Sequence, residues 1–97
     1  MMIHVVILTT EHGDDVAARH TYEEALKAAG EMIVETIDEL EREIDGNTEG
    51  ETNLAILREF LAEGQFEQAM SVYNDLHEEH VSSADAHHLR IKEVDLK

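Results

Sequence analysis

The chain has 97 residues, a length typical of a single domain. Its 23 acidic and seven basic side chains give a formal charge of −16 at pH 7, which opposes direct binding to nucleic-acid phosphates or to an anionic membrane. The absence of cysteine excludes disulfides, thiolate metal sites and a thiol nucleophile. No apolar run approaches the roughly 18 residues that a transmembrane helix needs.

The first twenty residues predict a β-hairpin. Residues 3–8 are β-branched and apolar on both faces, a pattern typical of a central strand that is covered on both sides. Residues 11–15 form a turn signal in which Gly13 can adopt a positive φ, and residues 16–20 follow as a short second strand. Because residues 1–8 lack the basic flank and cleavage site of a signal peptide, we expect a cytoplasmic protein.

A long amphipathic helix is expected from Thr21 to about Asp45. Thr21 can cap this helix, and Glu24 three residues later completes a capping box. Apolar residues recur at spacings of three and four and therefore share one side: Leu26, Ala29, Ile33, Ile37, Leu40 and Ile44. The opposite side is mostly acidic: Glu24, Glu31, Glu35, Asp38, Glu39 and Arg42. At 1.5 Å per residue the helix would be about 35 Å long.

A second, shorter helix is expected after a polar loop at residues 46–50. Thr52 or Asn53 can cap it, and its apolar residues indicate a span of 54–63. Gly64 is a natural end for this helix, since glycine readily adopts the left-handed conformation that follows a last turn.

The rest of the chain predicts a third helix at 66–80, a connector at 81–86 and a last strand at 88–96 beside the first strand. The predicted fold is therefore α+β, with a small three-stranded antiparallel sheet of order 2-1-3 packed by three helices. We expect residues 1–97 to form one domain.

Residues 54–76 resemble a single helical hairpin of the tetratricopeptide kind. Gly64, Phe66, Ala69 and Tyr73 stand at the turn and second-helix spacing of that motif. The motif needs neighbouring repeats to bury its faces, and the sequence holds no second copy. The resemblance therefore implies a mode of helix packing only.

The layout as a whole resembles that of small uncharacterised acidic proteins encoded in phage and prophage genomes. The residues that carry this resemblance are the turn at 12–16, the segment at 21–25, the end of the helical pair at 73–76 and the closing strand. The resemblance implies an accessory or anti-defence role in the host cytoplasm.

A group of histidines near the end of the third helix is a candidate metal site. His77 and His80 are three residues apart on a helix and can share a metal, with a further ligand from His87 or His88. They also lie on the buried side of the helix, so the alternative is a pair of histidines at the edge of the core. Their spacing is not the His-Glu-x-x-His pattern of zinc peptidases, and we expect no cofactor.

The sequence contains no recognisable catalytic motif. Ser71, Ser82 and Ser83 do not lie in a nucleophile-elbow context, and the five glycines are scattered instead of gathered in a phosphate-binding loop. Carboxylate pairs are frequent, but a catalytic pair needs unequal environments. We therefore expect no enzymatic activity.

The acidic side of the long helix is the main candidate for binding a partner. Its length matches about one turn of DNA, so a protein that grips phosphates through Arg and Lys could dock there and be blocked. The candidate partner-binding residues are Glu24, Glu31, Glu35, Asp38, Glu39 and Glu43. The prediction is a non-enzymatic interaction module that resembles a DNA mimic and inhibits or modulates a host protein with a basic surface.

Four alternatives stay open. The acidic positions can serve solubility alone, or they can reflect adaptation to high salt, since the chain has only three lysines. Leucine-rich faces of the second and third helices can pair in a homodimer. The histidine group can instead make the chain a small metal- or ligand-binding domain.

Overall fold

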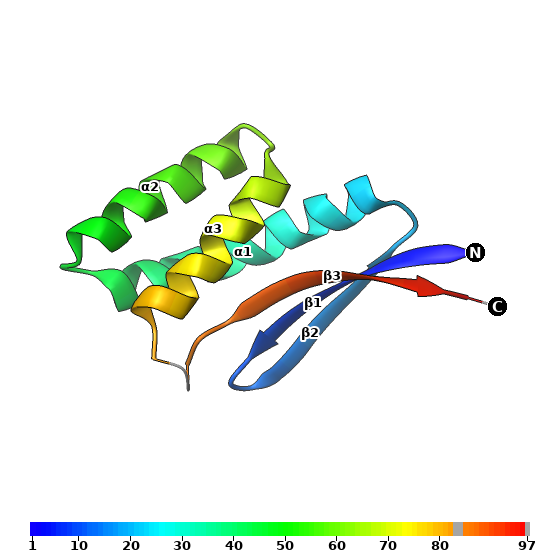
Figure 1. Ribbon diagram of the computed structural model, residues 1–97, viewed down its shortest axis with the longest axis horizontal. Coiled ribbons are helices and arrows are strands. Elements are labelled where there is room, and N and C mark those ends of the chain that lie inside the picture. Colours follow the sequence, from blue (N-terminus) through cyan, green and yellow to red (C-terminus); the bar gives the residue numbers. More distant parts are fainter. Residues whose placement is uncertain (83–84, 97) are drawn as a thin grey trace.

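The computed structural model describes residues 1–82 and 85–96, which form one antiparallel sheet with helices on one of its faces (Figure 1). This part of the chain measures 49 × 30 × 17 Å. In chain order its elements are β1 (Met2–Thr10), β2 (Gly13–Arg19), α1 (Tyr22–Ile44), α2 (Thr48–Ala62), α3 (Phe66–His80) and β3 (His88–Asp95). The strand order is β2-β1-β3, so the predicted α+β fold is confirmed. Of the predicted connector at 81–86, residues 83–84 lie outside the described residues, as does Lys97.

The first two strands form the predicted hairpin, and β1 is central in the sheet. The second strand begins at Gly13 instead of residue 16, because residues 13–15 pair with the end of β1, so the expected turn at 11–15 is too long. Gly13 follows the tight turn with a φ of +117°, a conformation that favours glycine. The Thr10 hydroxyl accepts a hydrogen bond from the backbone N–H of His12 and donates one to the carbonyl of Gly13. These bonds satisfy polar backbone groups at the turn that joins the two strands.

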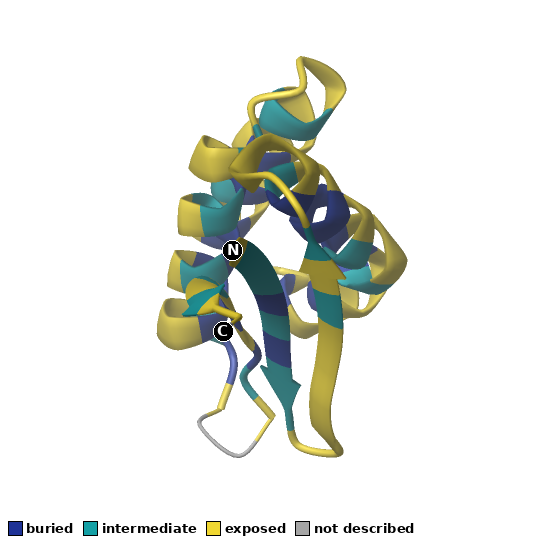
Figure 2. Cartoon of the chain, turned by 90° about the vertical axis from the view of Figure 1, so that its right-hand side faces the viewer, coloured by how far each residue is buried: buried dark blue, intermediate teal, exposed yellow. Residues whose placement is uncertain are grey.

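Only one face of β1 is covered. Alternate residues of a strand point to opposite faces, and Val6 and Leu8 are buried on the face toward the helices (Figure 2). Ile3, Val5 and Ile7 point to the other face and are only half-buried. No element of residues 1–82 and 85–96 packs on that second face. The expectation of a strand covered on both sides is therefore wrong, because apolar content alone does not show whether a second layer exists.

The uncovered face of the sheet is apolar with basic residues at one edge. Residues directly opposite each other in an antiparallel ladder project to the same side. Ile7 therefore shares its face with Val16 of β2, which is 61% exposed, and with Arg90 of β3. Val5 similarly shares it with Lys92.

Helix α1 begins and ends where the sequence predicts. The Thr21 hydroxyl accepts a hydrogen bond from the Glu24 N–H, as in the predicted capping box, and donates one to the Glu24 carboxylate. The predicted apolar stripe faces the core, with Leu26 only half-buried. The buried residues of the helix are Ala25, Ala28, Ala29, Gly30, Ile33, Ile37, Leu40 and Ile44.

Helix α2 is longer than predicted, because it begins at Thr48 instead of residue 54. Its N-cap is Asn47, whose side-chain oxygen accepts a hydrogen bond of 2.8 Å from the Gly50 N–H. Gly50 was expected in a loop but is buried in the first turn, where an added Cβ would lie 3.2 Å from Ile44. The expected loop at 46–50 is wrong for residues 48–50, because Asn47 caps the helix instead of Thr52 or Asn53.

Helix α3 spans the predicted residues and is anchored to β3 through Asn74. Gly64 ends the preceding turn with a φ of +74°, as expected for a residue after a helix. The Asn74 side chain accepts a hydrogen bond from the Leu89 N–H and donates one to the Leu89 carbonyl, both at 2.8 Å. One amide thus pairs with the backbone where β3 begins.

The helices form two levels above the sheet. Helices α1 and α3 contact the strands directly, whereas α2 packs on α1 and α3 and touches no strand of the described chain (Figure 1). The core lies between the sheet and the helices and continues among the three helices, and it is mostly aliphatic, with Tyr73 as its largest buried side chain. The ring of Phe66 lies on Gly30, so close that an added Cβ would be 2.4 Å from a ring carbon.

Candidate functional site

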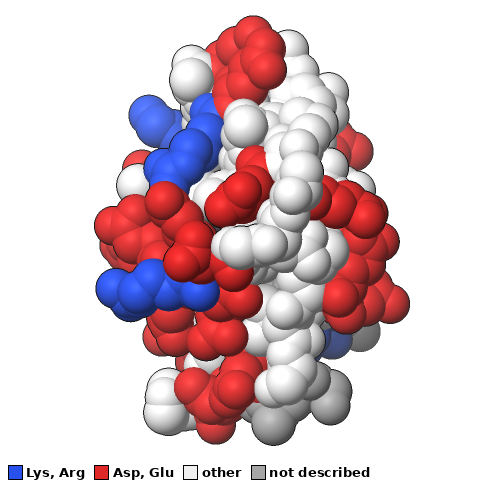
Figure 3. All heavy atoms as spheres, turned by 90° about the vertical axis from the view of Figure 1, so that its left-hand side faces the viewer, with Lys and Arg blue, Asp and Glu red and all other residues white. Residues whose placement is uncertain are grey.

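The negative charge of the protein is concentrated in its helical half. Residues 21–80 hold 17 of the 23 acidic side chains but only three of the seven basic ones. Figure 3 shows the end of the molecule where α2 begins, with carboxylates on both sides of a band of uncharged atoms. The uncovered sheet face differs, since Arg90 and Lys92 outnumber Asp14 on it. The charge is therefore distributed unevenly between the two sides of the fold.

The six predicted partner-binding residues are all exposed on α1, and they border different hollows of the surface. Glu31 and Glu35 lie at one hollow between α1 and the start of α3. Asp38 lies in a separate depression toward the end of α1. Glu24 takes part in the N-terminal cap of α1, and Glu39 faces the turn of the hairpin. Glu43 is exposed in the last two turns of the helix.

The hollow at Glu31 and Glu35 is the most apolar of these surroundings. It has a volume of about 450 Å³ and is lined by Lys27, Gly30, Glu31, Val34, Glu35, Leu61 and Phe66. Val34 is 59% exposed, although it is a large apolar residue on a mostly acidic helix side. The hollow therefore combines two free carboxylates with an accessible apolar floor.

Farther along α1 the carboxylates are partly neutralised. Arg58 of α2 forms an ion pair with Glu41 and approaches Asp38 at 3.9 Å. All three side chains are substantially exposed, so the pairs hold the two helices together only weakly. Asp38 is thus less available to an external cation than Glu31 or Glu35.

The hairpin turn adds a second group of carboxylates near Glu39. Glu11 and Asp85 come from different parts of the chain and lie together at this end of the sheet. The pKa of Glu11 is raised above its ordinary value, mainly by a hydrogen bond with Asp85 and further by the repulsion between the two charges. No pattern in the sequence predicts that these two carboxylates lie together.

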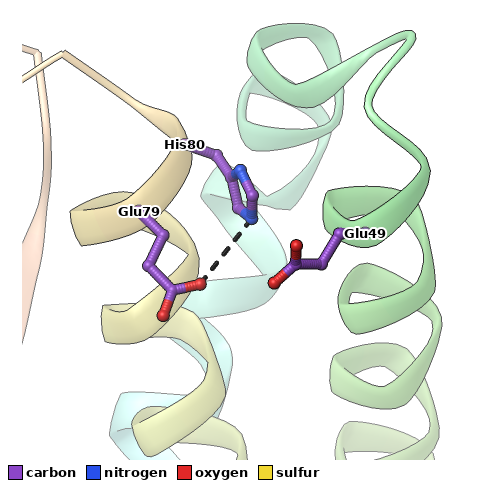
Figure 4. A group of neighbouring side chains, drawn as sticks. All are labelled: Glu49, Glu79 and His80. Carbon is purple, nitrogen blue, oxygen red and sulfur yellow. Dashed lines mark ion pairs between the residues drawn. The ribbon is translucent and has the colours of Figure 1, made fainter.

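The four candidate histidines do not gather around one point. His77 and His87 are buried and stack on each other, with ring centroids 4.5 Å apart. His88 is exposed on β3. His80 lies near Glu49 and Glu79 instead of near the other histidines (Figure 4).

His77 and His87 belong to a buried hydrogen-bonded network. His77 Nδ1 accepts a hydrogen bond from the His87 N–H at 3.1 Å, and His87 Nδ1 lies 3.0 Å from the Tyr73 hydroxyl. That hydroxyl also lies 2.8 Å from Oγ1 of Thr36 on α1. The network therefore connects α1, α3 and the segment before β3.

Burial dominates the titration of this network. It raises the pKa of Tyr73 to about 12, because the phenolate would be poorly solvated. Burial and, to a smaller extent, the nearby His87 together lower the pKa of His77 to about 4. Both groups are neutral at pH 7, which is typical of a structural network.

Glu49, Glu79 and His80 form a mixed oxygen and nitrogen cluster between α2 and α3 (Figure 4). The sequence pointed to His80 but to neither glutamate. The available signal for Glu79 was its position beside His80. Glu49 could be found only after the true start of α2 was known, because that start places it in the first helical turn.

The chain matches no protein-family model, no curated protein and no solved structure. Among the described residues, none of the helices is both long enough and apolar enough to cross a membrane.

Proposed function

We propose that the protein is a non-enzymatic interaction module whose acidic helical half binds a basic surface of another protein. The observation that carries the proposal is the hollow of about 450 Å³ at which Glu31 and Glu35 accompany the exposed Val34. An Arg or Lys side chain has an apolar stem and a charged head. The stem would pack on Val34 and Phe66 while the head pairs with a glutamate.

The surrounding charge supports the same partner chemistry. The helical half carries 17 acidic and three basic residues, so its field attracts a basic surface and accelerates the encounter. A protein that binds nucleic acid presents such a surface, with Arg and Lys placed to contact phosphates. Docking on the helical half would occupy these residues and block the nucleic acid.

The resemblance to phage-encoded acidic proteins extends the proposal to the kind of partner. The partner would be a host protein with a nucleic-acid-binding surface, and the effect would be inhibition or modulation, as in anti-defence. The setting would be the host cytoplasm.

A charge-reversal pair tests the proposal. Glu31→Lys/Glu35→Lys removes both carboxylates from the hollow, whereas Asp14→Lys/Asp15→Lys changes the net charge equally on β2, outside that hollow. Proteins captured from a host lysate at about 50 mM and about 500 mM salt are identified for the wild type and both variants. A captured protein is then purified and titrated against each form, with and without competing duplex DNA.

The expected partner is basic, dissociates at the higher salt and competes with DNA. Its affinity should fall about tenfold or more in the α1 variant and much less in the β2 variant. Equal affinity of the wild type and the α1 variant would contradict the proposal. Binding that does not change with salt would contradict it as well.

A further inference from the structure

Three side chains from two helices converge where the start of α2 faces the end of α3 (Figure 4). Glu49 lies in the first turn of α2, and Glu79 and His80 lie in the last turn of α3. Each residue offers one ligand atom, and these atoms all lie within 4.8 Å of one another. Two carboxylate oxygens and one imidazole nitrogen therefore share a small volume.

The ring nitrogen of His80 is the independent observation that points to a ligand. The His80 side chain is 11% exposed, and its Nε2 atom is buried with no hydrogen-bond partner among the described residues. Nε2 lies 3.8 Å from Oε2 of Glu79, which is too far for a hydrogen bond. A buried polar atom is normally satisfied, and a cation held between this nitrogen and the two carboxylates would satisfy it.

We propose that Glu49, Glu79 and His80 bind one Zn²⁺ ion between α2 and α3. Zinc binds imidazole nitrogen and carboxylate oxygen at about 2.0–2.2 Å, which places tetrahedral ligand atoms about 3.3 Å apart. The separations of at most 4.8 Å exceed this value by about 1.5 Å or less. Both glutamates are exposed, so their side chains can rotate to close the site. Water completes the coordination.

The surroundings favour a divalent cation at this place. The last turn of α3 carries partial negative charge on its free carbonyl groups, which offsets the partial positive charge of the first turn of α2 and leaves the two carboxylates as the dominant local charge. A hollow of about 230 Å³ beside the site includes Asp75, one turn before Glu79. The imidazole donor selects Zn²⁺ over Mg²⁺ and Ca²⁺, which prefer oxygen ligands. The bound ion would fasten the first turn of α2 to the last turn of α3.

Zinc titration of the protein without a histidine tag tests the proposal. Isothermal titration with ZnCl₂ at about 150 mM salt limits weak attraction to the many surface carboxylates. The ligand variants are Glu49→Gln, Glu79→Gln and His80→Gln. Their matched controls are Glu51→Gln in the same turn of α2, Glu78→Gln beside Glu79, and His88→Gln, an exposed histidine outside the cluster.

The wild type and the three controls are expected to bind one Zn²⁺ per chain, with a thermal midpoint that rises on binding. Each ligand variant should lose affinity by about tenfold or more. Co²⁺ should give the absorption spectrum of a four-coordinate ion in the wild type and lose it in Glu79→Gln. Weak binding at several sites shared by all seven proteins would overturn the proposal. Equal competition by Ca²⁺ would overturn it too, since an imidazole ligand disfavours calcium. If His80→Gln does not fold, the test depends on Glu49→Gln and Glu79→Gln, because these two side chains are exposed and their replacement should leave the fold intact.

Discussion

His77 is a buried titratable side chain whose charge the fold resists. Its pKa is about 4 in the folded protein and 6.5 in an unfolded chain, because burial and the nearby His87 both disfavour the imidazolium. Between these two pH values the unfolded chain binds a proton that the folded protein does not. The stabilising contribution of neutral His77 is therefore complete above pH 6.5 and is lost as the pH falls toward 4.

The predicted consequence is a loss of unfolding free energy between pH 7 and pH 5 that depends on His77. Urea unfolding at both pH values should show a smaller loss for His77→Gln than for the wild type, since glutamine does not titrate. His88→Gln is the control, because His88 is exposed and should leave the wild-type loss unchanged. The same pH dependence in all three proteins would show that His77 does not resist protonation.

Gly30 makes a contact that its helical position alone does not reveal. A Cβ there would lie 2.4 Å from a ring carbon of Phe66, so Gly30→Ala must displace the ring. We expect a net cost of about 1–3 kcal/mol, although alanine favours a helix over glycine by about 1 kcal/mol. In a Phe66→Ala background the clash is absent, and Gly30→Ala should become neutral or stabilising. Urea unfolding of the four proteins measures this, and an equal cost in both backgrounds would contradict the contact.

Single residues were predictable where their signal is local. Thr21 and Glu24 are three apart and form the predicted cap, and Gly13 and Gly64 adopt the predicted positive φ. The proximity of His80 to Glu49 was not predictable, because these residues are 31 positions apart on two helices. Sequence spacing shows which residues are neighbours on one helix, but it does not show which residues of another element pack against them.

At the scale of elements, the start of α2 depends on the Asn47 cap. Its side chain satisfies the Gly50 N–H at 2.8 Å, which has no partner within the helix. Asn47→Ala should therefore cost about 1 kcal/mol of unfolding free energy, and Asn47→Asp should retain most of the stability. Thr48→Ala is the neighbouring control and should change little. Urea unfolding measures all three, and a cost equal to that of Thr48→Ala would show that the cap is not needed.

Elements with strong periodicity were predicted well and the others less so. Helix α1 agrees at both ends because its apolar stripe runs through the whole span and a capping box marks its start. The first turn of α2 has no such stripe, since Thr48, Glu49 and Glu51 are exposed and only Gly50 is buried. The second face of β1 was mispredicted for a related reason: Val5 and Ile7 are apolar, but no further element among residues 1–82 and 85–96 covers them.

At the scale of the whole molecule, the charge sets two opposite responses to salt. The described chain extends over at most 49 Å, and the screening length is about 30 Å at 0.01 M salt and about 8 Å at 0.15 M. Repulsion among the carboxylates of the helical half is thus felt across most of the molecule at low salt and only locally at physiological salt. Added salt should therefore raise the thermal midpoint of the protein.

The same screening should weaken the binding of a basic partner. The two responses to salt therefore distinguish the proposed function from adaptation to high salt. We expect the protein to stay folded at about 10 mM salt and to bind its partner most tightly there, because the attraction is then least screened. A protein adapted to high salt would unfold on dilution, since its own repulsion would exceed the stability of the fold. Circular dichroism and partner titration over one salt series measure both quantities. Loss of structure at low salt would show that the carboxylates reflect adaptation to a high-salt habitat. A protein that stays folded, and whose affinity for the partner falls while its stability rises with added salt, would show that they serve binding.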